Sequence, residues 1–139
     1  GGAKIAQLIM WKGAGILPWC TYVGDDAWSV HELQTNRELL AEGRAQRHCV
    51  YSYVNLCARG STSIFSLRRC ASEGRQFTGH GIPEWDYRTA KPVVTMEVRD
   101  RHLVQARGRL NRSPDDLERR LIKRWANLHE IKFGDDWAG

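Results

Sequence analysis

The 139-residue sequence predicts a single domain with an α+β fold. The expected core is a small antiparallel β-sheet, a three-strand meander to which one N-terminal strand could be added. Helices cover one face of this sheet, and a C-terminal amphipathic basic helix completes the fold. Two observations support the prediction. Three stretches alternate apolar and polar side chains, as half-buried strands do, and helix-capping patterns stand on both sides of them.

Two helices are expected before the strands. Thr35 and Glu38 have the spacing of a capping box, and Gly43 can end the short helix that follows. A second helix is predicted from about Arg47 to Ala58. Apolar side chains recur along it at the spacing of a core-facing stripe. The stripe consists of Cys49, Val50, Tyr53, Val54 and Cys57.

The three predicted strands cover residues 62–69, 93–99 and 103–107. The stretch 71–92 between the first two is rich in Gly, Pro and polar residues, which predicts a long loop. A three-residue turn at 100–102 would pair Glu97 with Gln105, whereas a two-residue turn would pair polar with apolar residues. Because a slip of one residue turns every side chain to the other face, burial favours the three-residue turn. The resulting polar face carries Ser66, Arg68, Thr95, Glu97, Gln105 and Arg107.

The same register predicts an apolar face on the other side of the sheet. It stacks Val98 on Val104 and Met96 on Ala106. The helix at 47–58 is expected to cover this apolar face, so that His48 would reach the polar face only near an edge.

The last helix has the clearest start signals. Ser113 is the predicted N-cap, Pro114 takes the first helical position, and Asp115 and Asp116 complement the helix dipole. Its core stripe is Leu117, Leu121, Trp125 and Leu128.

The positive charge is concentrated in one segment. Residues 99–124 contain nine basic and four acidic side chains, a net charge of +5 that equals the net charge of the whole chain. Such a segment suits DNA or RNA, although a solvated basic helix face would look the same. The candidate anion-binding residues are Arg68, Arg99, Arg107, Arg109, Arg112, Arg119, Arg120, Lys123 and Arg124.

Glu97 is the one carboxylate predicted on the polar face, with Arg68, Arg99 and Arg107 around it. This cluster is either an ion-pair network that orders the sheet or an anion site in which arginines hold a phosphate. His48 is either an acid–base group or a hydrogen-bonding partner of the backbone near Gly43. The candidate catalytic residues are His48, Glu97, Gln105 and Arg107, and the candidate supporting residues are Ser52, Tyr53, Ser66, Thr95, Gly108 and Asn111.

No metal and no cofactor are predicted. The four cysteines lack zinc-ligand spacing and are interpreted as reduced, mostly buried thiols. Magnesium chemistry needs clustered carboxylates, of which the polar face offers one. Adjacent His48 and Cys49 point about 100° apart on a helix, which is poor geometry for a nucleophilic pair.

Linked motifs along the chain resemble the PcfJ-like family. They are Glu42-Gly43, then His48-Cys49-Val50 with Tyr53, the strand with Ser66 and Arg68, Thr95 with Glu97, and Gln105, Arg107, Gly108 and Asn111. The resemblance covers about residues 35 to 130 and leaves out residues 1–34 and the loop at 71–92. It implies an N-terminal extension packing on the core at 1–34, a PcfJ-like domain at 35–131 and a tail at 132–139. The family occurs around conjugative plasmids, phages and other bacterial mobile elements, and the resemblance brings no established activity with it.

The leading functional expectation is a nucleic-acid-binding or nucleic-acid-processing accessory domain of a bacterial mobile element. The alternative is a metal-independent enzyme acting on a phosphodiester or nucleotide, with Glu97, His48 and the arginines Arg68 and Arg107. A third is a protein-binding or inhibitor module, which exposed Trp19, Trp85 or Trp137 would support. The chain shows no signal-peptide pattern and no long apolar stretch, so a cytoplasmic protein without a membrane partner is expected.

Overall fold

The computed structural model describes residues 7–71, 76–77, 83–84, 90–134 and 137. Its centre is a six-stranded sheet in the order β1-β2-β3-β6-β7-β8, and a separate pair of short strands stands apart from it. All neighbouring strands run antiparallel except the pair β7 and β8. The sheet strands are β1 (Trp19–Val23), β2 (Asp26–Leu33), β3 (Ser63–Cys70), β6 (Lys91–Arg99), β7 (His102–Arg107) and β8 (Lys132–Phe133), and the short pair is β4 (Gln76–Phe77) and β5 (Pro83–Glu84).

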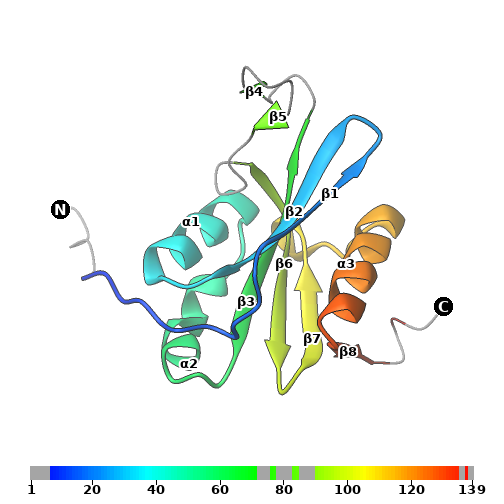
Figure 1. The fold of residues 1–139 in the computed structure, drawn as a ribbon. Helices are drawn as coiled ribbons and strands as arrows, with labels where there is room; N and C mark the ends of the chain where they lie inside the picture. The colour runs from blue at the N-terminus through cyan, green and yellow to red at the C-terminus, as the bar shows by residue number, and fades with distance from the viewer. Residues whose placement is uncertain (1–6, 72–75, 78–82, 85–89, 135–136, 138–139) are drawn as a thin grey trace.

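Helices lie on both sides of this sheet (Figure 1). The α1 and α2 helices are on one side and α3 is on the other. The α+β prediction is confirmed, and the N-terminal part contributes two strands rather than one. The helical elements are α1 (Asn36–Gln46), the 3-10 turn η1 (Val50–Tyr53), α2 (Val54–Ala58), the 3-10 turn η3 (Arg109–Asn111) and α3 (Asp116–Leu128).

The apolar face of the sheet is covered by α3, and the prediction that residues 47–58 cover it is wrong. Phe65 and Met96 are fully buried against Trp125, with the rings of Phe65 and Trp125 4.8 Å apart. The α1–η1–α2 segment instead packs on the polar face. The reason lies in α1, whose inner side buries the carboxylate of Glu42, since a buried polar group needs hydrogen-bonding partners and the polar face supplies them. A second, smaller core fills this side with Trp11, Leu33, Leu39, Val50, Cys57 and Ile64.

The β6–β7 hairpin reaches the predicted pairing by a different route. Glu97 pairs with Gln105 as predicted, but the turn has two residues, Asp100 and Arg101, both at positive φ (47° and 61°). Such turns match the twist of a hairpin. Between this turn and the Glu97–Gln105 pair, β7 has one residue more than β6. Val104 takes up the extra residue as a β-bulge, so that the polar side chains of the two strands again share one face. The predicted stacking of Val98 on Val104 is therefore wrong: Val98 pairs with Leu103, and Val104 is 50% exposed.

The predicted helix at 47–58 is interrupted at its start. Arg47 adopts a left-handed conformation (φ 53°, ψ 53°) and ends α1, so the helix runs three residues beyond Gly43. The next turn begins only at Val50. Cys49 is consequently exposed rather than part of the core stripe. Thr35 caps α1 as predicted, because its hydroxyl accepts a hydrogen bond from the Glu38 backbone N–H at 3.0 Å.

The α3 helix begins later than predicted. Its N-cap is Asp115 rather than Ser113, and Asp115 forms a reciprocal capping box with Glu118. The Glu118 carboxylate completes the box by accepting a hydrogen bond from the Asp115 backbone N–H at 2.9 Å. Leu128 is 64% exposed and does not belong to the core stripe. Most of the predicted loop at 71–92 lies outside the described residues. Among the described residues, no helix combines the length and apolar character that crossing a membrane requires.

The bulge makes a prediction about stability. Val104→Ser is expected to change the free energy of unfolding by less than about 0.5 kcal/mol, because the side chain is exposed. Leu103→Ala, one residue earlier, is expected to cost roughly 2–4 kcal/mol because it leaves a cavity in the core. Urea unfolding of the two variants measures both values. Equal costs would show that Val104 is packed and that the bulge is misplaced.

Candidate functional site

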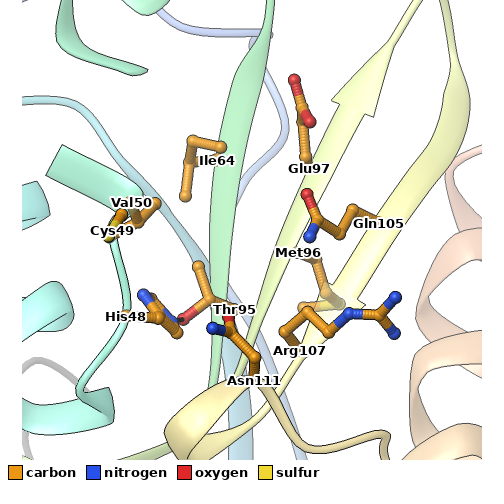
Figure 2. Close-up of a pocket in the computed structure, with 10 residues that line it drawn as sticks. All are labelled: His48, Cys49, Val50, Ile64, Thr95, Met96, Glu97, Gln105, Arg107 and Asn111. Atoms are coloured by element: carbon orange, nitrogen blue, oxygen red, sulfur yellow. Dashed lines mark hydrogen bonds between the residues drawn. The ribbon is translucent and has the colours of Figure 1, made fainter. Parts of the chain in front are cut away.

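A small cavity opens on the polar face, between the α1–η1 connection and the strands β6 and β7 (Figure 2). Its volume is about 50 Å³. All four candidate catalytic residues line it, together with Thr95 and Asn111 from the supporting set. The structure thus brings together residues from three of the linked sequence motifs. The lining residues are His48, Cys49, Val50, Ile64, Thr95, Met96, Glu97, Gln105, Arg107 and Asn111.

His48 contacts the strand β6 through Thr95. The distance from His48 Nε2 to Thr95 Oγ1 is 2.9 Å. The turn that ends α1 aims the ring at the strand, and the His48 backbone N–H donates to the Gly43 carbonyl at 3.1 Å. The backbone of His48 thus makes the expected hydrogen bond near Gly43, while its ring enters the polar face.

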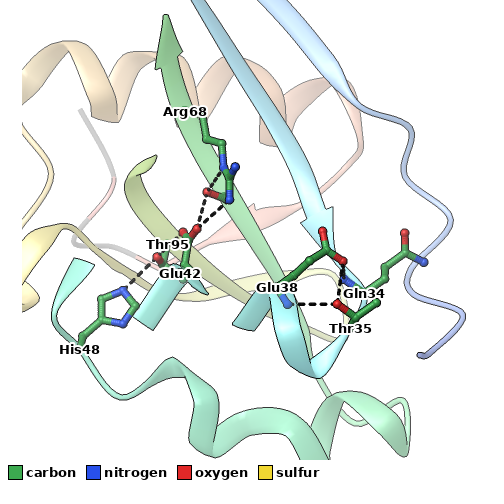
Figure 3. Close-up of polar contacts among 8 residues, drawn as sticks. Gln34, Thr35, Glu38, Glu42, His48, Arg68 and Thr95 are labelled. Atoms are coloured by element: carbon green, nitrogen blue, oxygen red, sulfur yellow. Dashed lines mark hydrogen bonds and ion pairs between the residues drawn. The ribbon is translucent and has the colours of Figure 1, made fainter. Parts of the chain in front are cut away.

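Behind Thr95 lies a second carboxylate of the polar face, which was not predicted there. Glu42 extends from α1 with no exposed surface. Its Oε2 accepts a hydrogen bond from Thr95 Oγ1 at 2.6 Å, and its Oε1 accepts from Ser66 Oγ at 3.0 Å and from Arg68 Nη2 at 3.1 Å (Figure 3). Three donors converge on this group, as expected for an ionised carboxylate.

A signal for Glu42 was present in the sequence. Glu42 follows Leu39 by three residues and precedes Gln46 by four, and such residues share one helix face. Since Leu39 belongs to the core, a carboxylate on the same face must enter the interior and find partners there. The polar face of the sheet supplies them.

The direction of the Thr95 hydrogen bond determines the tautomer of His48. A hydroxyl has one proton, and Thr95 donates it to Glu42. The contact with His48 therefore requires Nε2–H as the donor. The lone pair of the neutral ring is then on Nδ1, the nitrogen that lies beside the backbone of His48 itself. Burial lowers the pKa of His48, partly offset by an interaction with its own backbone. Burial also raises the pKa of Glu42, against which the donors Thr95, Arg68 and Ser66 act.

Glu97 is oriented toward the other end of the polar face. Its Oε2 accepts from Thr62 Oγ1 and from Arg99 Nε, both at 2.6 Å. In Figure 2 its carboxylate points away from Gln105. The predicted cluster of Glu97 with three arginines is therefore divided. Arg68 pairs with Glu42 instead, and it is 8% exposed.

The remaining supporting residues have mostly structural partners. Ser52 Oγ donates to the Cys49 carbonyl at 2.8 Å, and Tyr53 Oη makes a long contact of 3.4 Å with Gln105 Oε1. Gly108 leaves room for a neighbour, because a Cβ atom there would lie 2.6 Å from Arg112 Cζ. Asn111 lines the cavity, and its backbone turns the chain at φ 62°.

The basic segment is divided between two sides of the sheet. The arginines of α3 lie on the side opposite the cavity. Several basic side chains of the segment are already engaged. Arg112, which precedes α3, makes two hydrogen bonds to the Glu118 carboxylate, at 2.7 and 2.9 Å. Arg119 and Arg124 lie over the rings of Trp137 and Trp19, at 4.3 and 5.6 Å from the ring centroids. Arg120 is exposed, whereas Lys123 is half-buried.

Aromatic and cysteine side chains give little support to the other functional expectations. Trp137 is buried, Trp19 is half-buried and Trp85 lies outside the described residues. All four cysteines are free, but only Cys57 is buried, and burial raises its pKa to about 12. Within the described part of the chain, no three His, Cys, Asp or Glu side chains gather as a metal ion would need.

The Glu42–Arg68 pair is expected to couple strongly. Glu42→Gln or Arg68→Met alone leaves a buried charge without its partner, at a cost of roughly 3–5 kcal/mol of unfolding free energy. The double variant removes both charges, and its cost should be well below the sum of the single costs. Chemical denaturation of the four proteins gives the coupling energy. Additive costs would mean that the two charges do not interact.

His48 is expected to make stability depend on pH. Because folding lowers its pKa below the ordinary value of 6.5, its contribution is complete above that pH and is lost as the pH falls through the folded pKa. Wild type should therefore lose more unfolding free energy than His48→Gln between about pH 7 and pH 5. Parallel pH dependence of the two proteins would contradict a half-buried ring that is neutral in the folded state.

Comparison with known proteins supports the motif resemblance. No curated protein and no solved structure matches the chain. A family model described as PcfJ-like protein matches residues 20–82. The matched region contains Glu42, His48, Ser66 and Arg68, and it also includes residues 20–34, which the quoted motifs leave out. The motifs of β6 and β7 lie beyond it. Over residues 20–82 the chain is thus similar to the PcfJ-like protein family.

Proposed function

We propose that the cavity at His48 is an acid–base site that acts on a phosphate-bearing ligand, a nucleotide or a nucleic-acid phosphodiester. The observation that carries the proposal is the chain of contacts from His48 through Thr95 to the buried Glu42. A buried carboxylate that fixes the tautomer of a histidine is the arrangement by which hydrolases and transferases activate a base.

The proton route follows from this chain. Nδ1 of His48 takes the proton of an attacking hydroxyl or water, whose oxygen then bonds to phosphorus. The bond from phosphorus to the leaving oxygen breaks, and the imidazolium returns its proton to that oxygen. Glu42 stabilises the transient positive charge through Thr95. Burial strengthens this effect, because water does not screen a group without exposed surface.

Arg107 is the residue best suited to bind the phosphate. It lines the cavity, its side chain is exposed, and its hydrogen bond to the Ala106 carbonyl is long at 3.4 Å. A guanidinium binds phosphate oxygens in pairs, which gives orientation as well as affinity. Arg68 forms an ion pair with Glu42 instead. Gln105 and Asn111 add amide groups to the same wall, and Glu97 holds Arg99 at its edge.

The wider setting belongs to the same proposal. We place the protein in the bacterial cytoplasm, as a nucleic-acid-processing accessory domain of a mobile element, the setting that the resemblance to the PcfJ-like family implies. The basic face of α3 is a second candidate for nucleic-acid binding, favoured by the excess charge of residues 99–124. Because α3 lies across the sheet from the cavity, substitutions distinguish these two surfaces.

The test compares wild type with His48→Gln, Thr95→Val and Arg107→Gln on single-stranded RNA, single-stranded DNA and mononucleotides, with and without EDTA. His48→Gln is expected to lower turnover about a hundredfold or more while retaining binding. Arg107→Gln should weaken binding about tenfold. Thr95→Val should reduce turnover less than His48→Gln and shift its pH profile, because it separates the ring from Glu42.

Arg37→Gln is the matched control, since this exposed residue lies on α1 away from the cavity. It should behave as wild type. Turnover that survives in His48→Gln would refute the acid–base role. Binding that depends on Arg120 and Lys123 but not on Arg107 would favour the α3 face.

A further inference from the structure

A second hollow lies beside the cavity, with a volume of about 220 Å³. It is formed by the last turn of α1, the first residues of β6 and the η3 turn. Its lining is basic and includes Gln46, Lys91, Val93, Arg109 and Arg112. None of its residues lines the cavity at His48.

The two hollows are lined by neighbouring residues of the same chain segments, and the two together are called the groove. Three chain segments contribute to both, each with residues two positions apart. Gln46 lines the second hollow and His48 the cavity; Val93 and Thr95 divide in the same way, as do Arg109 and Asn111. Two residues of a strand span about 7 Å. This spacing is comparable to the distance between successive phosphates of an extended nucleic-acid strand.

The charges of the second hollow are arranged for an anion. Lys91 and Arg109 are exposed, and neither forms an ion pair with a carboxylate of the described residues. Arg112 is held in place by Glu118 and by the Val93 carbonyl, which accepts from its Nη2 at 3.2 Å. Arg112 therefore forms a fixed wall, while Lys91 and Arg109 are available to a ligand.

The wall between the hollows is a strained and well-anchored turn. Leu110 and Asn111 both adopt left-handed conformations, with φ 56° and 62°. Such a conformation costs a non-glycine residue conformational energy, and residues that adopt it are concentrated at ligand sites. The Gly108 N–H donates to the Arg112 carbonyl at 2.8 Å and closes the turn. The turn directs Asn111 into the cavity and Arg109 into the second hollow.

We propose that the second hollow binds the phosphate adjacent to the one at His48, so that the ligand is a single-stranded polynucleotide rather than a mononucleotide. This inference rests on the proposed function. A single strand is favoured because the groups proposed for acid–base chemistry are recessed: Thr95 is 7% exposed and His48 is half-buried. A flexible strand can bend into such a groove, whereas a duplex presents its phosphates on a stiff, convex surface.

The test measures affinity for a nucleoside monophosphate and for single-stranded RNA and DNA of about eight nucleotides. The Lys91→Ala/Arg109→Ala double variant is compared with Arg37→Ala/Lys132→Ala, which removes the same charge from exposed positions outside both hollows. Wild type should bind the oligonucleotide more tightly than the monophosphate. The groove variant should lose about tenfold or more in oligonucleotide affinity and retain monophosphate affinity.

Salt dependence provides a second measurement. Each phosphate contact on a single strand contributes about 0.7 to the slope of log affinity against log salt, so the groove variant should lose roughly 0.7 to 1.4 from that slope. The control variant should keep the wild-type slope and affinity. Equal oligonucleotide affinity in the two double variants would overturn the inference, as would a wild type that binds the monophosphate equally well.

Arg107→Gln separates this inference from the proposed function. Monophosphate binding that requires Arg107, with oligonucleotide binding indifferent to Lys91 and Arg109, would retain the proposed function and remove the groove. Oligonucleotide binding that requires Lys91 and Arg109, with monophosphate binding indifferent to Arg107, would retain the groove as a site and remove the proposed function. Absence of binding by both probes would overturn both.

Discussion

The buried carboxylate of Glu42 is the constraint around which the structure is organised. A charge without solvent contact must be neutralised and hydrogen-bonded, or the fold loses several kcal/mol. Glu42 meets this requirement with Ser66 and Arg68 on β3 and Thr95 on β6. The pairing joins α1 to two neighbouring strands and sets the side of the sheet on which α1 packs. It also leaves Thr95 with one remaining contact, through which His48 is aimed at the cavity.

The two faces of the sheet consequently differ in the interactions that stabilise them. The face under α3 is a conventional apolar core, with the ring of Trp125 packed on Phe65. The face under α1 combines a small apolar cluster with a polar interior, and it contains the cavity. Such polar interiors are costly when incompletely satisfied and favour one arrangement when complete. The side that holds His48 therefore derives its order from hydrogen bonds, while the side under α3 derives its stability from apolar packing.

Much of the site could be predicted, because strand alternation is a local property. The polar alternation of β3, β6 and β7 placed Thr95, Glu97 and Gln105 on one face, and the structure has them there. The predicted three-residue turn was wrong. A two-residue turn gives the same pairing of Glu97 with Gln105 because a bulge at Val104 corrects the register. Glu42 was missed because a helix pattern shows that a residue faces inward but not which partner it meets. His48 was misjudged for the same reason: its helix was assigned to the wrong face of the sheet.

The sequence by itself determined the α+β composition, the polar and apolar faces of the strands and the PcfJ-like motifs, since each depends on residue type and short-range periodicity. Only the tertiary structure decided which helix covers which face, because that choice depends on matching buried polar groups across segments far apart in the chain. It also decided that the basic segment divides between two sides of the sheet. The net charge of a segment can be counted from the sequence, whereas the side of the sheet on which its charged side chains lie depends on where α3 packs.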